Sequence, residues 1–213
     1  MKKWIVLLLV FVVALSSCAQ GPVRQETYGG VPCPIEEINW GMSEAECLSA
    51  LGISADGVER QEMSGETARG PFQEVNLALP DTIKILGLTA TVTLSFFEQY
   101  QNLQVGLIGI TLNFGTDVDE TAFQKSVEEK LCPDLELQNF TWKSEKTLAD
   151  IPHEIVEEYF MRNSGNDAER SRPLGTISME PKSVRGQTLL NIQNAPAVIM
   201  AKAQEKQNTD ASK

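Results

Sequence analysis

The stretch Leu88-Thr89-Ala90-Thr91-Val92-Thr93-Leu94-Ser95-Phe96 decides the fold of this chain, because apolar and polar residues alternate along it without a break. Successive side chains of a β-strand point to opposite faces, so this period of two predicts a strand with one face on a core and the other in water. Residues 108–114 repeat the pattern, with Thr111 and Asn113 at polar positions. The loop between the two stretches, residues 98–104, is short enough for an antiparallel hairpin.

Further strands are predicted on both sides of this hairpin. Residues 75–79 alternate in the same way, and Pro80-Asp81-Thr82 turns the chain into a short strand at residues 83–85. Residues 140–146, 176–179 and 188–192 also have the composition of strands. Residues 197–203 fit either a strand or a helix.

Gly41-Met42-Ser43-Glu44-Ala45-Glu46-Cys47 predicts the start of a short helix that ends at Leu51-Gly52. Ser43 is a good N-cap, and Glu46 three residues later completes a capping box. Gly52 can adopt the left-handed conformation that closes a helix.

Two more helices are predicted in the second half of the chain. One begins near Asp117 or Asp119, places Phe123, Val127 and Leu131 on one face, and ends before Pro133. The other opens after Pro152 and carries apolar residues at 155, 156, 159 and 160.

This order of elements predicts an α+β fold, in which an antiparallel sheet carries helices on one face. A helix followed by strands occurs twice along the chain, which leaves open a tandem of two small modules.

The N-terminus predicts export and lipid anchoring. Lys2 and Lys3 precede an apolar run, Trp4–Leu15, that is shorter than the roughly 20 residues of a membrane-spanning helix and fits a signal peptide. Leu15-Ser16-Ser17-Cys18 follows and resembles the lipobox of bacterial lipoproteins. The resemblance implies cleavage before Cys18 and acylation of that residue, which would hold the protein on the extracytoplasmic side of its membrane. Ala19 resembles the pattern sorted to the outer membrane when a cell has two membranes. A plain secreted protein, or an uncleaved anchor, with an incidental Cys18 is the alternative.

These signals divide the chain into four parts. Residues 1–17 form the signal peptide, residues 18–36 a flexible tether, residues 37–204 the folded domain, and residues 205–213 a disordered tail.

The chain is strongly acidic. Its net charge of −11 becomes −13 once Lys2 and Lys3 are removed. Such a surface argues against nucleic acid as a partner.

The cysteines leave several pairings open. A Cys33–Cys47 disulfide and a Cys47–Cys132 disulfide both fit an exported protein, while buried free thiols also fit Cys47 and Cys132.

The helix opening at residues 41–52, together with the lipobox and the order of elements, resembles two kinds of small bacterial envelope module. These are the SmpA/OmlA-type lipoprotein of the outer-membrane assembly machine and the β-lactamase-inhibitor-protein-like fold. In both, a helix of this kind precedes an antiparallel sheet. The resemblance implies a module that binds another protein and catalyses no reaction.

No pattern in the sequence predicts an enzyme, a cofactor or a metal site. His153 is the only histidine, and the chain lacks a Gly-x-Ser-x-Gly elbow and a glycine-rich phosphate loop. The acidic residues at 117, 119 and 120 lack the spacing of a calcium loop and fit a helix N-terminus.

The sequence therefore favours a lipid-anchored envelope protein that binds another protein through the polar face of its sheet. That face would carry Thr89, Thr91, Thr93, Thr111 and Asn113, rimmed by Phe97 and Tyr100. An extracytoplasmic small-ligand carrier, or an enzyme with an unrecognised site, is the alternative.

Overall fold

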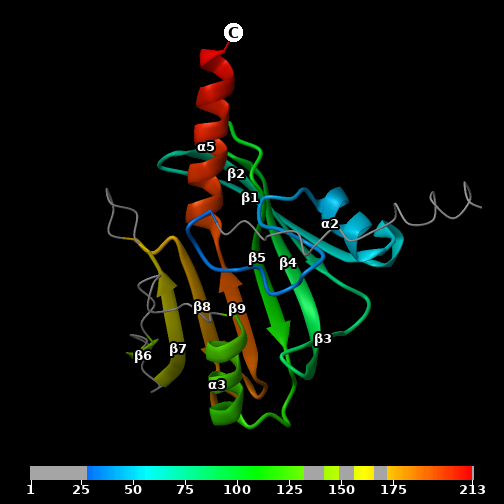
Figure 1. The fold of residues 1–213 in the computed structure, drawn as a ribbon, viewed down its shortest axis with the longest axis vertical. Helices are drawn as coiled ribbons and strands as arrows, with labels where there is room; N and C mark the ends of the chain where they lie inside the picture. The colour runs from blue at the N-terminus through cyan, green and yellow to red at the C-terminus, as the bar shows by residue number, and fades with distance from the viewer. Residues whose placement is uncertain (1–27, 132–141, 149–155, 166–171, 213) are drawn as a thin grey trace, which may run out of the picture.

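A computed structural model describes residues 28–131, 142–148, 156–165 and 172–212 of the chain (Figure 1). The signal peptide, Cys18, Cys132 and His153 lie outside these residues, so what the sequence predicts for them stays a prediction. No helix in the described ranges is both long enough and apolar enough to cross a bilayer.

The core of the fold is one antiparallel sheet built from two runs of strands. Its order is β1-β2-β4-β5-β9-β8-β7-β6, and β3 pairs with the start of β4. The strands are β1 (Glu59–Thr67), β2 (Gly70–Ala78), β3 (Ile83–Ile85), β4 (Leu88–Tyr100), β5 (Gly106–Asn113), β6 (Trp142–Leu148), β7 (Val156–Ser164), β8 (Gly175–Glu180) and β9 (Leu189–Gln193). The first run ends at β5 and the second at β9, and these two strands pair with each other.

Each run follows a helix, which confirms the predicted α+β class. Helix α2 (Glu44–Leu51) precedes β1, and α3 (Glu120–Leu131) precedes β6. Two shorter elements, η1 (Ala55–Gly57) and α4 (Lys182–Arg185), and the C-terminal helix α5 (Ala195–Ala211) complete the described elements. The repeated helix-then-strands order is therefore present, and both repeats contribute to a single sheet.

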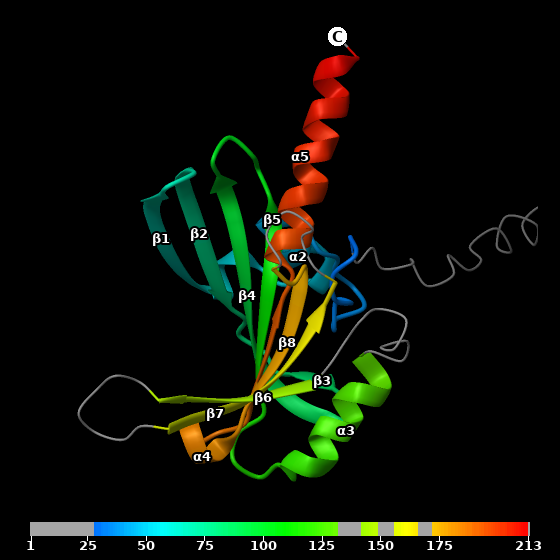
Figure 2. The same ribbon diagram turned by 90° about the vertical axis from the view of Figure 1, so that its left-hand side faces the viewer.

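The predicted alternation divides the sheet into two faces. In β4, Ala90, Val92, Leu94 and Phe96 are buried, whereas Thr89 and Thr91 are exposed. The buried residues form one cluster with Cys47 and Leu48 of α2, with three residues of α3 and with Val198 of α5. Figure 2 shows these three helices on the same side of the sheet. One face thus carries the core, and none of these three helices covers the other.

Helix α2 has both of the ends that its sequence predicts. The Glu46 amide donates to Ser43 Oγ at 3.3 Å, and Glu46 Oε2 accepts from the Ser43 amide at 2.8 Å. The bond from the Ser43 amide, and then a second bond that the Ser43 hydroxyl donates to the same oxygen at 2.8 Å, lower the pKa of the Glu46 carboxyl. Gly52 ends the helix with a φ of 67°.

The segment preceding α2 is packed into the fold, so the prediction of a tether reaching residue 36 is wrong. Residues 28–40, here called the N-terminal strap, include Val31 and Ile38 with no exposed surface. The Val31 amide donates to Asn194 Oδ1 at 3.0 Å, and the Val31 carbonyl accepts from Trp40 Nε1 at 2.7 Å. The Gly and Pro content suggested flexibility, but burial of Val31, Cys33 and Ile35 fixes the strap.

Two other predictions are corrected by long-range pairing or by local propensity, and one strand was not predicted. The stretch at 156–164 is strand β7, because it pairs with β6 and β8, where a helix was expected. Strand β1 was not predicted, since its nine residues are all exposed and carry no alternation. Residues 205–211 belong to helix α5 and are not a disordered tail, because the buried residues Ala197 and Val198 anchor a helix that Ala, Gln, Glu and Lys extend.

Cys33 and Cys47 are buried free thiols. Burial raises the pKa of each thiol to about 12, which keeps both protonated and unreactive near neutral pH. Of the pairings that the sequence leaves open, Cys33–Cys47 is thus absent from the structure, and Cys132 lies outside the described residues.

Replacing Trp40 by phenylalanine should destabilise the fold. The change keeps most of the apolar contact but removes the donor to the Val31 carbonyl, which would stay buried without that bond. We expect the free energy of unfolding to fall by about 1–3 kcal/mol, measured by urea denaturation followed by circular dichroism. Thr89→Ala, at an exposed position, should change it little, and equal stability of all three chains would contradict this role of the strap.

Candidate functional site

The structure brings the predicted polar residues together on the face of the sheet opposite α2, α3 and α5. Thr93 pairs with Thr111 across β4 and β5, and Thr91 pairs with Asn113. Thr89 lies further along β4, opposite Lys84 of β3. We call this surface the open face.

Polar side chains of the open face are bonded to one another across strands. Thr111 Oγ1 donates to Asn191 Oδ1 at 3.0 Å, and Asn191 Nδ2 donates to Glu180 Oε1 at 2.8 Å. Glu180 in turn pairs with Arg185 at 2.8 Å. Asn113 Nδ2 donates to Gln187 Oε1 at 3.0 Å. These bonds hold the side chains in defined positions, so the face presents a pre-organised surface.

Aromatic side chains gather at one end of the open face. The rings of Phe72 and Phe97 meet edge to face with centroids 6.4 Å apart, and Phe97 stacks on Tyr100 at 5.2 Å. Phe72 lies over Gly65 of β1, where a Cβ would crowd the ring. Met63, on the same face of β1, is 52% exposed. We call Met63, Phe72, Phe97 and Tyr100 the aromatic end.

The sequence identified Phe97 and Tyr100 as a rim but not Phe72 or Met63. Their strands carry no clear alternation near these residues, and only the β1–β2 and β2–β4 registers place them beside Phe97. Partly exposed aromatic and Met side chains surrounded by polar ones are typical of surfaces that bind other proteins.

A separate hollow lies on the helix side of the sheet, between α2 and the ends of β2 and β4. Its volume is about 820 Å³, within the range of small-molecule sites. Leu48, Phe96 and Leu103 line it with apolar surface, and Glu44 and Glu98 are its charged residues.

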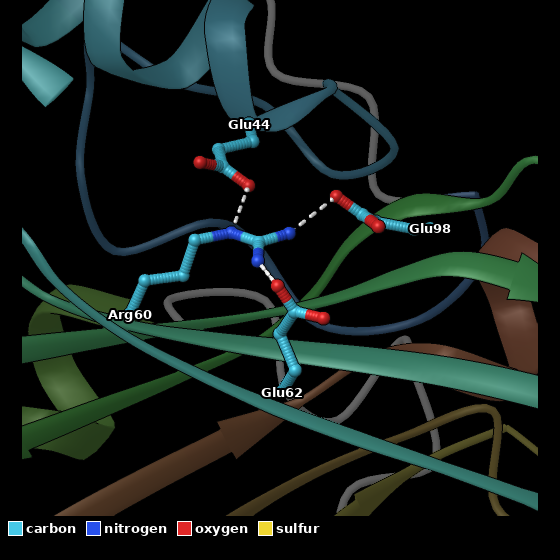
Figure 3. Close-up of polar contacts among 4 residues, drawn as sticks. All are labelled: Glu44, Arg60, Glu62 and Glu98. Carbon is cyan, nitrogen blue, oxygen red and sulfur yellow. Dashed lines mark hydrogen bonds and ion pairs between the residues drawn. The ribbon is translucent and has the colours of Figure 1, made fainter.

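Arg60 of β1 joins the two glutamates beside this hollow (Figure 3). Its Nε lies 3.3 Å from Glu44 Oε2, one terminal nitrogen lies 2.9 Å from Glu98 Oε1, and the other contacts Glu62. Burial alone would lower the pKa of the guanidinium, but the bonds and charges of Glu44 and Glu98 raise it overall. One cation thus faces three carboxylates, which leaves this corner of the molecule net negative.

The acidic and cysteine side chains of the described residues form no metal-binding cluster. Within them, no group of three or more His, Cys, Asp or Glu side chains could hold a metal ion. The two described thiols are buried and protonated. What the described surfaces offer is hydrogen bonding and apolar contact.

Comparison of the chain with protein-family models, with curated proteins and with solved structures finds no match.

Replacing Arg60 by glutamine should destabilise the protein more at low ionic strength than in about 1 M salt. The change leaves three glutamates close together without a cation, and salt screens the repulsion between their carboxylates. Because the ion pairs are partly exposed, we expect a loss of about 1 kcal/mol at low salt, measured by urea denaturation. Arg60→Lys, which keeps the charge, should lose less, and a salt-independent loss would contradict the electrostatic role of Arg60.

Proposed function

We propose that this protein is a lipid-anchored protein of the cell envelope that binds another protein through its open face and catalyses no reaction. The observation that carries the proposal is the presence of the aromatic end and a bonded polar surface on one face, opposite the helices α2, α3 and α5. Protein interfaces concentrate their binding energy in a few aromatic anchors surrounded by polar contacts.

The rigidity of the open face supports this proposal. Its side chains stand on paired strands, and several are already held by hydrogen bonds, so little conformational entropy remains to be lost on binding. The acidic charge of the chain favours a partner whose contact surface is neutral or basic.

The anchor would keep the open face close to a membrane. Cys18 and Tyr28, the first described residue, are ten residues apart. At about 3.3–3.6 Å per residue, this segment can reach at most about 36 Å. A partner would accordingly be a membrane protein, or a protein held near the same bilayer, and in a cell with two membranes that bilayer would be the outer one.

The hollow beside α2 favours a second candidate, an extracytoplasmic carrier of a small ligand or an enzyme. Its volume and apolar lining suit a small molecule, and its charged residues would favour a cationic group. This candidate uses the opposite side of the sheet, so substitutions on the open face distinguish the two.

Lysine at both Thr91 and Thr93 should abolish capture of the protein partner without unfolding the domain. Both positions lie in the middle of the open face, where two long cations would displace a docked surface. The measurement is co-isolation of the full chain from cross-linked membranes, with quantitative mass spectrometry of what accompanies it. Ser49→Lys with Thr121→Lys adds the same charge at exposed helix positions and should leave capture unchanged. Equal capture by both double variants would remove the open face as the contact surface.

Replacing Cys18 by alanine should release the protein from the membrane fraction. Without the thiol there is no site for the lipid, and the acylated form should disappear from the intact-mass spectrum. Ser17→Ala keeps the cysteine and should remain membrane-bound. Retention of the Cys18→Ala chain in the membrane at an unchanged mass would contradict lipid anchoring.

A further inference from the structure

Strand β1 forms one edge of the sheet, as Figure 2 shows. Its nine residues pair with β2 in an uninterrupted register, and all nine are exposed. Proteins usually protect an edge strand by shortness, proline, a bulge, a cover or charge. Within the part of the chain that the structure describes, β1 has only charge among these devices, with Glu59, Glu62 and Glu66 beside a single Arg60.

We propose that the outer edge of β1 pairs antiparallel with β1 of a second copy of this chain, with Met63 facing Met63 of that copy. The two sheets then continue into one across a twofold axis. The proposal goes beyond the binding of a different protein through the open face.

Backbone geometry limits this pairing to a few registers. Alternate residues of an edge strand direct their amide and carbonyl groups outward. These residues are either all odd-numbered or all even-numbered, and two identical strands share the same set. Paired residue numbers must therefore add up to an even number. Each register is named by its central residue, which lies opposite the same residue of the second copy. The registers centred on residues 62, 63 and 64 keep the largest number of residue pairs.

Charge selects the register centred on Met63. Centring on Glu62 places that glutamate opposite itself, and centring on Ser64 places Glu62 opposite Glu66, so both put like charges in contact. Centring on Met63 instead places Arg60 opposite Glu66 and Glu62 opposite Ser64, with no like charges directly opposed.

Arg60 has donors left to bind the carboxylate of Glu66 from the second copy. A guanidinium has five N–H donors. Contacts with described residues take one position on each nitrogen, to Glu44, Glu62 and Glu98. One N–H on each terminal nitrogen is left for Glu66 of the second copy.

The pairing would also enlarge the open face. The twofold axis of such a dimer is perpendicular to the sheet. The open faces of the two copies therefore lie on the same side of the joined sheet. Met63 lies on the open face beside this axis, and the register places Phe72 opposite Gly65 on the neighbouring strand. The two aromatic ends would then adjoin at the centre of a surface twice as wide.

The lipid-anchored N-terminal segments of both copies would emerge on the same side of the dimer. The N-terminal strap lies on the helix side of the sheet (Figure 2), and the twofold axis preserves that side in both copies. The strand-pair interface is small for a stable dimer, so we expect it to form between copies that share a membrane. This expectation rests on the proposed anchor, which the Cys18→Ala experiment tests separately.

Oxidative cross-linking of variants with one accessible thiol tests the register, since Cys33 and Cys47 are buried and Cys18 would carry the lipid. Met63→Cys is introduced into the full chain with Cys132→Ser, and membranes are treated with copper phenanthroline before non-reducing electrophoresis. We expect a covalent dimer, because residue 63 alone meets itself in this register. Glu62→Cys and Ser64→Cys should cross-link at least about tenfold more slowly, since their cysteines lie diagonal to one another. Cross-linking fastest at residue 62 or 64, or at none of the three positions, would overturn the proposal.

A mixed-chain experiment tests the antiparallel direction independently. The register places Glu59 opposite Thr67 of the second copy. Chains with Glu59→Cys and chains with Thr67→Cys, carrying tags of different size, should form the mixed disulfide when made together. Neither variant should cross-link when made alone. Disulfides between like-tagged chains, or no mixed product, would contradict the proposed pairing.

Discussion

The pairing of β5 with β9 is the interaction on which the rest of this structure depends. It joins two strand runs that would otherwise each end in an unpaired edge, and it aligns Ile110 with Ile192 and Leu112 with Leu190. All four of these side chains are fully buried. The N-terminal strap reinforces the junction, because Asn194 at the end of β9 binds Val31 while Gly41, just after the strap, donates to β5 at Leu107.

This arrangement explains why one face of the sheet is open. The strap and helices α2, α3 and α5 all add their apolar residues to a single core cluster on the other face. The open face is consequently stabilised by cross-strand polar bonds such as those of Thr111, Asn191 and Glu180. Among the side chains that the structure describes on this face, apolar ones gather at the aromatic end, where a partner could bury surface without disturbing the core. An edge pairing through β1 would extend the same surface.

The sequence predicted those parts of the molecule that local patterns determine. The alternation in β4 and β5 correctly assigned Thr91, Thr93, Thr111 and Asn113 to one face, and the capping residues Ser43 and Gly52 correctly bounded α2. Patterns could not reveal β1 or β7, because long-range backbone pairing determines both strands. The sequence did not predict the packing of the N-terminal strap for a similar reason, since the burial of the strap depends on Asn194, far along the chain. The position of Phe72 beside Phe97 and the hollow beside α2 likewise depend on the register of the strands.

The central claim is that the open face contacts another protein at the membrane. Its most direct test is photo-cross-linking in intact cells from a reactive residue at Thr111 or Phe97, followed by mass spectrometry of the trapped species. The same residue at Gln99, which lines the hollow on the opposite side, provides the matched control. This account predicts one reproducible envelope protein trapped from Thr111 and Phe97 and not from Gln99. Trapping from Gln99 alone, or no adduct at Thr111 and Phe97, would contradict it.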